Sequence, residues 1–486
     1  MKLRQLLDDE MSAPLLAGGV EVSGLTPDSR AIQPGFVFAA LSGSKTDGAK
    51  YVAQAVEKGA AVILAGRDAE LPDTGQATVI RSSDPRRALA LMAARFHVGQ
   101  PEIITAVTGT SGKTSVATFV RQIWSRSGHK AASLGTIGLV RPDGRVVDSL
   151  TTPEPVTLHR LLSELAREDV THLSMEASSH GLEQRRLDGV KLSAGAFTNL
   201  GHDHLDYHKD QEDYFNQKKR LFHTVLPEGA GAVINLDAPR AEEVVDEAYG
   251  HGLKVMTVGY KARGIKLLSL ERDGFAQKLA VSHEGESYEI RLPLIGTYQA
   301  SNALVAAGLC IVTGSDPEGV FTRLGELQTV NGRLDIVGEA RGGMVVVDYA
   351  HKPDALEAAL DALRPFVSGK LVCVFGCGGD RDRIKRPVMG RIAVAKADRV
   401  IVTDDNPRSE QPAAIRAEIL AGATGAEEFG DRGEAIRAAV GAIGPGDVIL
   451  IAGKGHEQGQ YVGDKVIPFS DHEAARAALG EVNGRD

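Results

Sequence analysis

The residues with the clearest chemistry form a glycine-rich loop between an apolar run at residues 103–107 and a helical pattern at residues 113–127. The loop, residues 108–114, has the sequence Thr-Gly-Thr-Ser-Gly-Lys-Thr. Its glycines allow backbone N–H groups to surround an anion, its lysine adds a cation, and its last threonine can ligate Mg²⁺. The general pattern has a glycine where this chain has Val107. The loop therefore predicts a nucleotide-phosphate site without choosing between a kinase, a switch and a ligase.

Acidic and imidazole side chains follow this loop in the sequence. Glu176 ends the apolar run at residues 172–175, where a carboxylate can hold Mg²⁺ directly or through water; a solvated loop carboxylate is the alternative. Residues 199–208, Asn-Leu-Gly-His-Asp-His-Leu-Asp-Tyr-His, are dense in imidazole and carboxylate groups. Zinc is the rival interpretation of this segment, but no cysteine and no His-Glu-x-x-His pattern supports it.

Four more polar clusters occur in the last third of the chain, each directly after an apolar run. The runs are residues 344–347, 371–375, 400–403 and 448–452, and the clusters are residues 348–351, 376–380, 404–408 and 453–457. Helical segments separate the runs, which is typical of a doubly wound parallel sheet. Ligands bind at the carboxyl ends of the strands in such sheets, so the four clusters predict one crevice.

These elements predict an α/β protein of three domains. Residues 1–98 alternate short strands (36–41, 60–65, 77–81) with helical stretches, as in a small α/β domain. Residues 99–331 predict a phosphate-loop domain with a mostly parallel sheet and a β insertion between residues 265 and 294. Residues 332–486 predict a Rossmann-like, doubly wound domain. Gly99-Gln100-Pro101 and Asn331-Gly332 mark the breaks.

Composition limits the classes of function. A formal net charge of −9 over 486 residues gives no broad basic surface, which argues against nucleic acid as a main partner. The three cysteines are too few for a disulfide framework, and we interpret Cys373 and Cys377 as core residues rather than metal ligands. The acidic N-terminus does not resemble a signal peptide, and no segment is apolar enough to span a bilayer. We therefore expect a soluble, cytoplasmic protein.

Taken together, the motifs resemble those of the Mur ligase family of bacterial peptidoglycan synthesis. The resemblance rests on residues 108–114, on Glu-Ala-Ser-Ser-His-Gly-Leu at 176–182 and on Asp-His-Leu-Asp-Tyr-His at 203–208. It continues at residues 214–218, 332–335, 347–351 and 379–382, and covers about residues 24–470. This resemblance implies a monomeric ligase that uses ATP and two Mg²⁺ ions to activate a carboxylate as an acyl phosphate, which an amine then attacks.

Within the family, the sequence is similar to members that add meso-2,6-diaminopimelate to the D-glutamate γ-carboxylate of UDP-N-acetylmuramoyl-L-alanyl-D-glutamate. Asp405-Asn406-Pro407-Arg408 resembles the family's diaminopimelate signature, and a guanidinium pairs bidentately with a carboxylate. A solvated Asx-Pro turn is the alternative for this tetrad. The alternatives for the whole protein are another acceptor (L-lysine, D-alanyl-D-alanine or a folate polyglutamate) and a phosphate-loop switch or binding module that is not a ligase.

The resemblance also implies roles for individual residues. The catalytic residues implied are Lys113, Glu176, His204 and Lys218. The metal ligands implied are Thr114, Glu176, His204 and Lys218, the last as a carbamate formed with CO₂; a surface pair with Lys219 is the alternative for Lys218. The ATP-binding residues implied are Thr108, Gly109, Thr110, Ser111, Gly112, Lys113, Thr114, Ser115, Asn302, Arg333, Asp348 and His351.

The remaining roles concern the two other substrates. The UDP-sugar dipeptide is expected to contact Ser29, Ser44, Lys45 and Thr46 in the first domain, and Thr151, Thr152, Ser178, Gln184 and Arg186 in the second. Diaminopimelate is expected to contact Arg381, Asp405, Asn406, Pro407, Arg408, Gly453 and Glu457. In this arrangement the arginines receive its distal carboxylate, and Gly453 and Glu457 receive an ammonium group.

Overall fold

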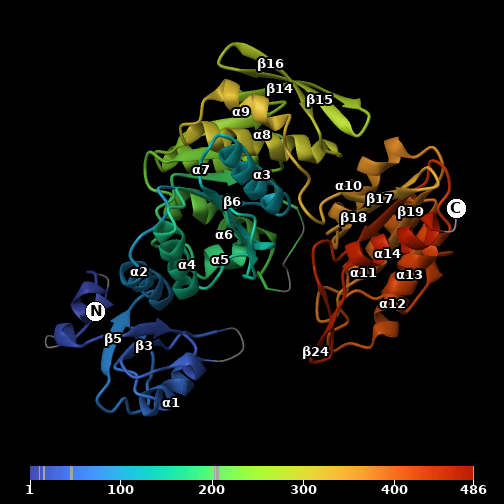
Figure 1. Ribbon diagram of the computed structural model, residues 1–486. Helices are drawn as coiled ribbons and strands as arrows, with labels where there is room; N and C mark the ends of the chain where they lie inside the picture. The colour runs from blue at the N-terminus through green and yellow to red at the C-terminus, as the bar shows by residue number, and fades with distance from the viewer. Residues whose placement is uncertain (10, 15–16, 44–46, 202, 204–206, 485–486) are drawn as a thin grey trace.

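The computed structural model describes residues 1–9, 11–14, 17–43, 47–201, 203 and 207–484, and Figure 1 shows three α/β units along the chain. The first unit is a five-stranded sheet in the order β1-β5-β4-β3-β2. Strands β2 (Gly24–Thr26), β3 (Phe36–Ala39), β4 (Val62–Gly66) and β5 (Thr78–Ser82) are parallel, and β1 (Met11–Ser12) is an antiparallel edge. Helices α1 (Val52–Glu57) and α2 (Pro85–Phe96) pack on this sheet. The strands predicted here are confirmed within two residues.

The central unit is an eleven-stranded sheet built around the strand that carries the glycine-rich loop. Strand β6 (Ile103–Thr108) lies between β10 (His172–Glu176) and β11 (Ala194–Phe197) and is parallel to both. Alternate side chains of β6 enter two separate cores, Ile104 and Ala106 on one face and Val107 on the other. Both faces of the strand are therefore covered, as expected of a parallel sheet.

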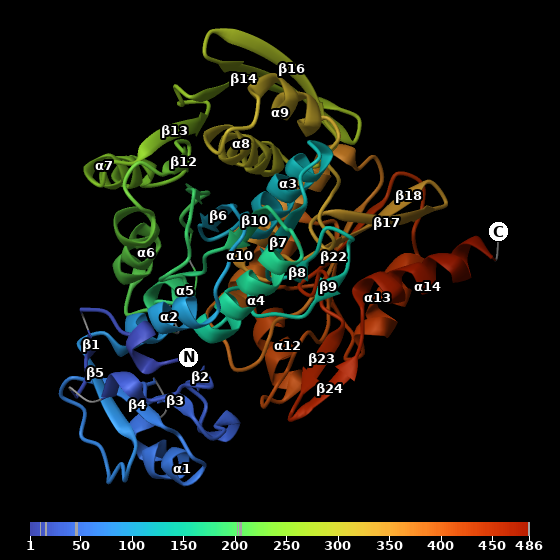
Figure 2. The ribbon, with the colours of Figure 1, turned by 60° about the vertical axis from the view of Figure 1, so that its left-hand side comes forward.

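Helices cover the two faces of this central sheet. Helices α3 (Lys113–Arg126) and α8 (Thr297–Val312) pack on one face. Helices α4 (Pro155–Arg167), α6 (Gln211–Arg220) and α7 (Ala241–Gly250) pack on the other (Figure 2). Beyond β12 (Gly231–Asn235), the strand β13 (Lys254–Gly259) leads into the predicted insertion.

The β insertion is confirmed and reaches the third unit. Strands β14 (Ile265–Asp273), β15 (Ala276–His283) and β16 (Glu286–Leu292) form an antiparallel edge of the central sheet. At the turn between β14 and β15, the ring of Phe275 stacks on that of Phe366 with centroids 5.2 Å apart. The guanidinium of Arg272 lies 5.5 Å from the centroid of the same ring. The insertion therefore contacts Phe366 of the third unit in two ways, by stacking of Phe275 and by a cation–π contact from Arg272.

The third unit is a six-stranded sheet in the order β17-β18-β22-β19-β20-β21. Its four central strands are parallel: β18 (Gly343–Asp348), β22 (Val448–Ala452), β19 (Leu371–Phe375) and β20 (Arg399–Val402). These are the four predicted apolar runs. Strand β17 (Asp335–Ala340) is an antiparallel edge that the sequence analysis did not predict, and β21 (Glu427–Glu428) is the opposite edge.

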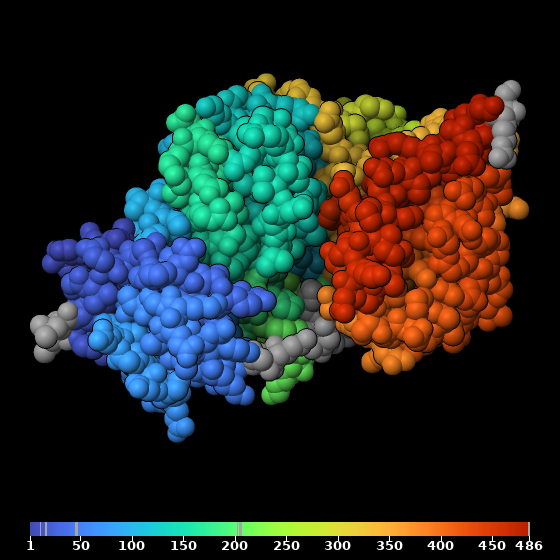
Figure 3. All heavy atoms as spheres, turned by 60° about the horizontal axis from the view of Figure 1, so that its bottom comes forward, coloured from blue at the N-terminus to red at the C-terminus, as the bar shows by residue number. Residues whose placement is uncertain are grey.

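Helices cover both faces of the third sheet, as the doubly wound prediction requires. Helices α10 (Pro353–Leu363), α11 (Lys385–Lys396) and α12 (Pro412–Leu420) share one core, and α13 (Arg432–Gly441) and α14 (Asp471–Asn483) share the other. A separate hairpin, β23 (Gly459–Val462) and β24 (Lys465–Pro468; Figure 2), pairs with Arg408 in the loop after β20. The first and third units flank the central unit, and the face between them is hollowed (Figure 3).

The three cysteines lie in the cores of their domains. Cys310 of α8, Cys373 of β19 and Cys377 after that strand are free and buried. The prediction that Cys373 and Cys377 are core residues is confirmed. Within the described ranges, no helix has the length and apolar character needed to cross a membrane.

A buried ion pair joins the two helices on the outer face of the third sheet. Arg432 begins α13 and Asp471 begins α14, and both side chains are 0% exposed. The guanidinium donates to both Asp471 carboxylate oxygens at 2.7 Å and to the carbonyl of Ala452, at the end of β22, at 2.9 Å. The pair therefore fixes both helices to a strand end that carries one of the polar clusters.

We predict that Asp471→Ala destabilises this unit by about 3–5 kcal/mol, because it leaves a buried guanidinium without its counter-charge. The measurement is the opening free energy of the β18, β19 and β22 amides by native-state hydrogen exchange. The matched control is Glu481→Ala, which removes the pair between Arg437 and Glu481 on the same two helices, where both side chains are exposed. That control should lose less than about 1 kcal/mol. Equal losses in the two variants would contradict the prediction.

Candidate functional site

The glycine-rich loop is shaped by close contacts that only glycine tolerates. Gly109 (φ 145°) and Gly112 (φ 85°) both lie at positive φ. A Cβ atom at Gly109 would lie 1.9 Å from Thr198 Oγ1, and one at Gly112 would lie 2.3 Å from Asn302 Oδ1. Helix α3 begins directly after Gly112, so its N-terminal N–H groups face the loop. Asn302, expected from the sequence to be near ATP, lies against this loop.

Two amines converge on one carbonyl of the loop. Lys113 Nζ donates to the Gly109 carbonyl at 2.8 Å and to that of Thr110 at 3.1 Å, and Lys218 Nζ donates to the same Gly109 carbonyl at 2.9 Å. Burial lowers the pKa of Lys113 to about 8. Burial, and then the nearby charge of Lys113, hold the pKa of Lys218 well below its ordinary value. Both shifts make the amines easier to deprotonate.

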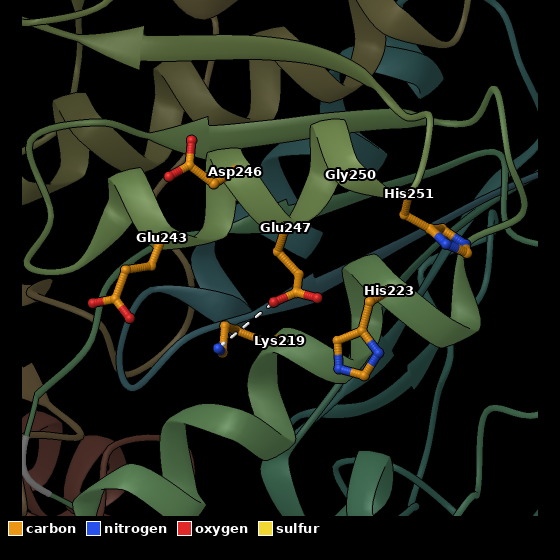
Figure 4. Close-up of a pocket in the computed structure, with 7 residues that line it drawn as sticks. All are labelled: Lys219, His223, Glu243, Asp246, Glu247, Gly250 and His251. Carbon is orange, nitrogen blue, oxygen red and sulfur yellow. Dashed lines mark ion pairs between the residues drawn. The ribbon is translucent and has the colours of Figure 1, made fainter.

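The alternative of a surface lysine pair is wrong for Lys218. Its side chain, from α6, is 1% exposed, and its amine lies 4.1 Å from the centroid of the Tyr214 ring. Lys219 points elsewhere, toward Glu247 of α7 at 3.6 Å. Figure 4 shows Lys219 in a pocket of about 550 Å³, lined by Lys219, His223, Glu243, Asp246, Glu247, Gly250 and His251. None of the residues to which the sequence analysis gave a role lines that pocket.

Glu176 is a buried carboxylate at the end of β10, so the alternative of a solvated loop residue is wrong. It is 1% exposed. Its Oε1 accepts hydrogen bonds from Thr114 Oγ1 and from the backbone N–H of Thr136, both at 2.8 Å. Its Oε2 accepts one from Thr136 Oγ1 at 3.2 Å. The start of α3 and the turn after β7 (Ala131–Gly135) therefore meet at one carboxylate.

Residues expected to hold the sugar and dipeptide lie in one hydrogen-bond network beside Glu176. Thr152 Oγ1 donates to the Glu176 carbonyl at 2.9 Å and accepts from the Ser178 N–H at 3.1 Å. Arg186 donates to the Thr152 carbonyl at 2.6 Å and to Gln184 Oε1 at 2.8 Å. Thr151 Oγ1 lies 3.1 Å from Thr136 Oγ1.

The first unit contributes Ser29 to the predicted uridine-nucleotide site. Its side chain is buried, and its hydroxyl donates to Gln54 Oε1 at 2.9 Å. The other predicted residues of this group, Ser44, Lys45 and Thr46, lie outside the described residues, as does His204 of the predicted metal site.

Three side chains of the third unit contact the central unit, one of them at the glycine-rich loop. Arg333 Nη2 donates to Thr114 Oγ1 at 3.3 Å, and its guanidinium lies 4.6 Å from the centroid of the Tyr349 ring. Lys352, directly before α10, forms an ion pair with Asp203. His456 Nε2 lies 3.2 Å from the Thr136 carbonyl. The ends of β18 and β22 therefore face the central unit.

Asp348 and His351, expected near ATP, organise the loops at this boundary. Asp348 is buried, and its two carboxylate oxygens accept from the N–H groups of Leu334 at 2.7 Å and Ala350 at 2.8 Å. Burial raises the pKa of Asp348 to about 6, although the nearby charge of Arg333 opposes the shift. Burial holds the pKa of His351 well below its ordinary value, and its Nδ1 lies 2.8 Å from the Tyr349 carbonyl.

The predicted amino-acid site is assembled at the ends of β20 and β22. Asn406 is buried, and its Nδ2 donates to Glu457 Oε2 at 2.9 Å. Arg408 lies at positive φ (51°), and its Nη1 donates to the Gly379 carbonyl at 2.9 Å. The solvated-turn alternative is wrong for this loop, because Asp405, Asn406 and Pro407 are buried.

Glycines allow these residues to pack closely. A Cβ atom at Gly378 would lie 2.8 Å from Arg408 Nη1 and 3.8 Å from Arg381 Cγ, so this glycine separates the two arginines. Arg408 is half-buried, whereas Arg381 is exposed. At Gly453 (φ 121°), a Cβ atom would lie 2.6 Å from Asp405 Oδ2. The four predicted strand-end clusters, those after β18, β19, β20 and β22, thus contact one another.

Sequence reasoning missed three residues that connect these parts: Thr136, Lys352 and Lys454. Lys352 directly follows His351 and Lys454 directly follows Gly453, both residues with an assigned role, and that position was a usable signal. Thr136 gave no signal, because the strand before it was not predicted.

The fold and the site together define a class of protein: a three-domain, phosphate-loop ligase. Models of three Mur ligase domains match the chain: the catalytic domain at residues 21–97, the middle domain at 107–310 and the glutamate ligase domain at 332–455. The chain belongs to the Mur ligase family.

Individual relatives cover almost the whole chain. A UDP-N-acetylmuramoyl-L-alanyl-D-glutamate–2,6-diaminopimelate ligase of Bradyrhizobium diazoefficiens is 56% identical over 483 residues, 99% of each chain. One of Brucella melitensis is 54% identical over 480 residues, 99% of this chain and 98% of the relative. A solved structure of a ligase with the same name is 31% identical, covers 99% of both chains and has a TM-score of 0.70.

The raised pKa of Asp348 predicts a pH-dependent stability. Because the folded pKa of about 6 exceeds the ordinary value of 3.8, the folded state binds this proton more tightly than the unfolded state. The stability that this proton gives the folded state is complete below about pH 4 and is lost as the pH rises through about 6. Asp348→Asn cannot titrate. The free energy of unfolding of the unmodified protein should therefore fall relative to that of the variant, by up to about 3 kcal/mol between pH 4 and 7.

The measurement is hydrogen-exchange protection of the β17 and β18 amides in both proteins across this pH range. Asp464→Asn, at an exposed hairpin turn, is the matched control. Parallel pH profiles for the unmodified protein and Asp348→Asn would refute the assignment.

Proposed function

We propose that the protein uses ATP to join meso-2,6-diaminopimelate to the γ-carboxylate of D-glutamate in UDP-N-acetylmuramoyl-L-alanyl-D-glutamate, a cytoplasmic step of peptidoglycan precursor synthesis. The observation that carries the proposal is that side chains of opposite charge contact one residue, Asn406. Arg408 Nη1 donates to its backbone carbonyl at 3.4 Å, and its Nδ2 donates to Glu457 Oε2 at 2.9 Å. Diaminopimelate carries an ammonium and a carboxylate at each end, so an amino acid of this kind needs both a cation and an anion. The names of the relatives agree with this choice.

The phosphate loop supports ATP as the energy source. The N-terminus of α3, the backbone N–H groups of the loop and the Lys113 amine form a cationic cradle for a triphosphate. Arg333 brings a second cation to Thr114 from the third unit. Bound phosphates would also raise the pKa of Lys113 from about 8 and keep it charged.

The residues present fit Mg²⁺. Glu176 and Thr114 place a carboxylate and a hydroxyl oxygen 2.8 Å apart at the entrance of the loop, and Mg²⁺ prefers oxygen ligands. When bound there, Mg²⁺ would neutralise phosphate charge and align the reacting groups. The buried amine of Lys218 fits conversion to a carbamate: its nitrogen lone pair attacks CO₂, the new N–C bond forms and the amine proton leaves to solvent. The resulting carboxylate group would supply oxygen ligands for a second ion.

The reaction follows from these placements. A γ-carboxylate oxygen of the dipeptide attacks the terminal phosphorus of ATP, the bond to ADP breaks and an acyl phosphate forms. Lys113 and Arg333 offset the repulsion between the two anions that must meet. The diaminopimelate amine then attacks the acyl carbon and loses its proton, and phosphate leaves. The network of Thr152, Ser178 and Arg186 is placed to orient the dipeptide beside Glu176.

The other assignments complete the proposal. Ser29 and residues 44–46 would hold the uridine nucleotide in the first unit. Arg381 would assist Arg408 at the distal carboxylate, and Gly453 and Glu457 would receive an ammonium group. By resemblance to the family, we also propose that the protein acts as a monomer.

Acceptor choice tests the proposal directly. Amine-dependent phosphate release should be strong with meso-diaminopimelate and weak with L-lysine. Arg408→Ala should lower kcat/KM for diaminopimelate about 10- to 100-fold, because a bidentate charged contact is lost, and should remove most of the preference. Arg399→Ala is the control: it removes an arginine at the other end of β20 that pairs with Glu427. Equal use of both amino acids by the unmodified protein would end the assignment.

Lys218 gives a second test. Lys218→Ala should lower kcat by at least about 100-fold, because it removes the group that becomes the carbamate. The neighbouring Lys219→Ala should retain activity. In ¹³C-bicarbonate the unmodified protein should show one carbamate carbon resonance that is absent from Lys218→Ala. An unchanged spectrum in the variant would rule out this lysine.

A further inference from the structure

Lys454 is a fully buried cation beside the residues predicted to bind the amino acid, and none of the roles described above uses it. It follows Gly453 at the end of β22 and is 0% exposed. Its ammonium donates to Asn406 Oδ1 at 2.9 Å, Glu457 Oε2 at 3.1 Å and the Gly459 carbonyl at 2.6 Å. Three N–H groups thus meet three acceptors. Burying a cation is costly without such partners, so the arrangement is specific.

The lysine sets the orientation of the Asn406 amide. Asn406 Oδ1 accepts from Lys454 Nζ and also from the Tyr461 N–H at 3.1 Å. A reversed amide would place its NH₂ group against two donors. The carbonyl oxygen must therefore face Lys454, which directs Nδ2 toward Glu457.

The same contacts engage one oxygen of Glu457 and leave the other more available. Its Oε2 accepts from both Lys454 and Asn406. Within the described part of the chain, Oε1 accepts one long hydrogen bond, from the Tyr349 hydroxyl at 3.4 Å. Oε1 is thus the oxygen that can receive a substrate ammonium.

Lys454 is also linked, through the β23–β24 hairpin, to the loop that carries Arg408. Its third acceptor, Gly459, begins β23. The hairpin holds Arg408 by its backbone: the Arg408 N–H donates to the Tyr461 carbonyl at 2.9 Å, and the Gly463 N–H donates to the Arg408 carbonyl at 2.7 Å. Gln460 Nε2 donates to the Asp405 carbonyl at 2.7 Å. One cation therefore connects the carboxylate that faces an ammonium with the loop that carries the arginine.

We propose that Lys454 is a positioning residue for the acceptor amino acid: it fixes Asn406, Glu457 and the 405–408 loop in the arrangement that binds the substrate's ammonium and carboxylate groups together. This inference rests on the proposed function. This role differs from a general structural one because it affects the binding of the acceptor amino acid and not that of the other two substrates.

The test is steady-state kinetics of Lys454→Met in the full chain, with each substrate varied in turn. Methionine is similar in length but has neither charge nor donor. KM for meso-diaminopimelate should rise about 10- to 100-fold, because hydrogen bonds to a charged group are lost. KM for ATP and for the UDP-sugar dipeptide should stay within about twofold, and kcat at saturating amino acid should be largely retained. Lys465→Met, an exposed lysine on β24, is the matched control and should change none of these values.

Lys454→Gln extends the test in case the methionine variant does not fold. Its amide keeps a donor for Asn406, so it should give a smaller rise that is again confined to the amino acid. Equal rises for all three substrates, or a fall in kcat alone, would overturn the inference. Failure of the unmodified protein to use diaminopimelate would refute the proposed function instead. The positioning role would then stand if Lys454→Met raised KM selectively for whichever amino acid is used.

Discussion

A single buried carboxylate, Glu176, holds the central site together. It receives the hydroxyl of Thr114 from the start of α3 and two donors from Thr136, and its backbone carbonyl receives the hydroxyl of Thr152. A Cβ atom at Gly135 would lie 2.2 Å from Glu176 Oε1, so the neighbouring strand must carry glycine there. The nucleotide loop, the dipeptide network and the Thr136 turn, which His456 approaches from the third unit, are thus positioned by one side chain.

Two groups of charged side chains stand out in the molecule, one around the phosphate loop and one in the third unit. Around the phosphate loop, cationic side chains dominate: Lys113 and Arg333 contact the loop that we propose binds ATP, and burial lowers the pKa of Lys218. In the third unit, cations and anions alternate, as recognition of a zwitterionic amino acid requires. A buried anion, Glu176, organises the surroundings of the phosphate loop. A buried cation, Lys454, organises the group in the third unit. In each case burial strengthens the electrostatic interactions because water cannot screen them.

Much of the fold could be predicted because its strands are continuous apolar runs. Strands β19 and β22 have the predicted bounds, since every residue in them is buried and polar clusters end them. Strand β7 was missed because Ala-Ala-Ser-Leu-Gly contains no β-branched or aromatic residue. Strand β17 was missed because its exposed and buried residues do not form a continuous apolar run. The β23–β24 hairpin lies in polar, glycine-rich sequence and depends on contacts with the 405–408 loop.

Site residues could be identified by motif, but their surroundings could not. Loop spacing indicated Lys113 and Glu176, yet nothing local to Glu176 showed that its carboxylate would be buried between two threonines. The pairing of Lys352 with Asp203 joins residues far apart in the sequence, and only the packing of two domains creates it. The same holds for Lys454 and Asn406. Motifs therefore predicted which kinds of side chain form the site. Tertiary contacts decided how those side chains are oriented and how readily they lose or gain protons.

The buried cysteines have a practical consequence. Cys310 belongs to the central domain, and Cys373 and Cys377 belong to the third. Burial raises the pKa of all three thiols, to about 12 for Cys373 and Cys377, so the native protein presents little thiolate to an electrophile. A thiol reagent can modify these sulfurs only when their domain opens. The rate of alkylation at each cysteine therefore measures how often its own domain opens. No engineered label is needed for this measurement.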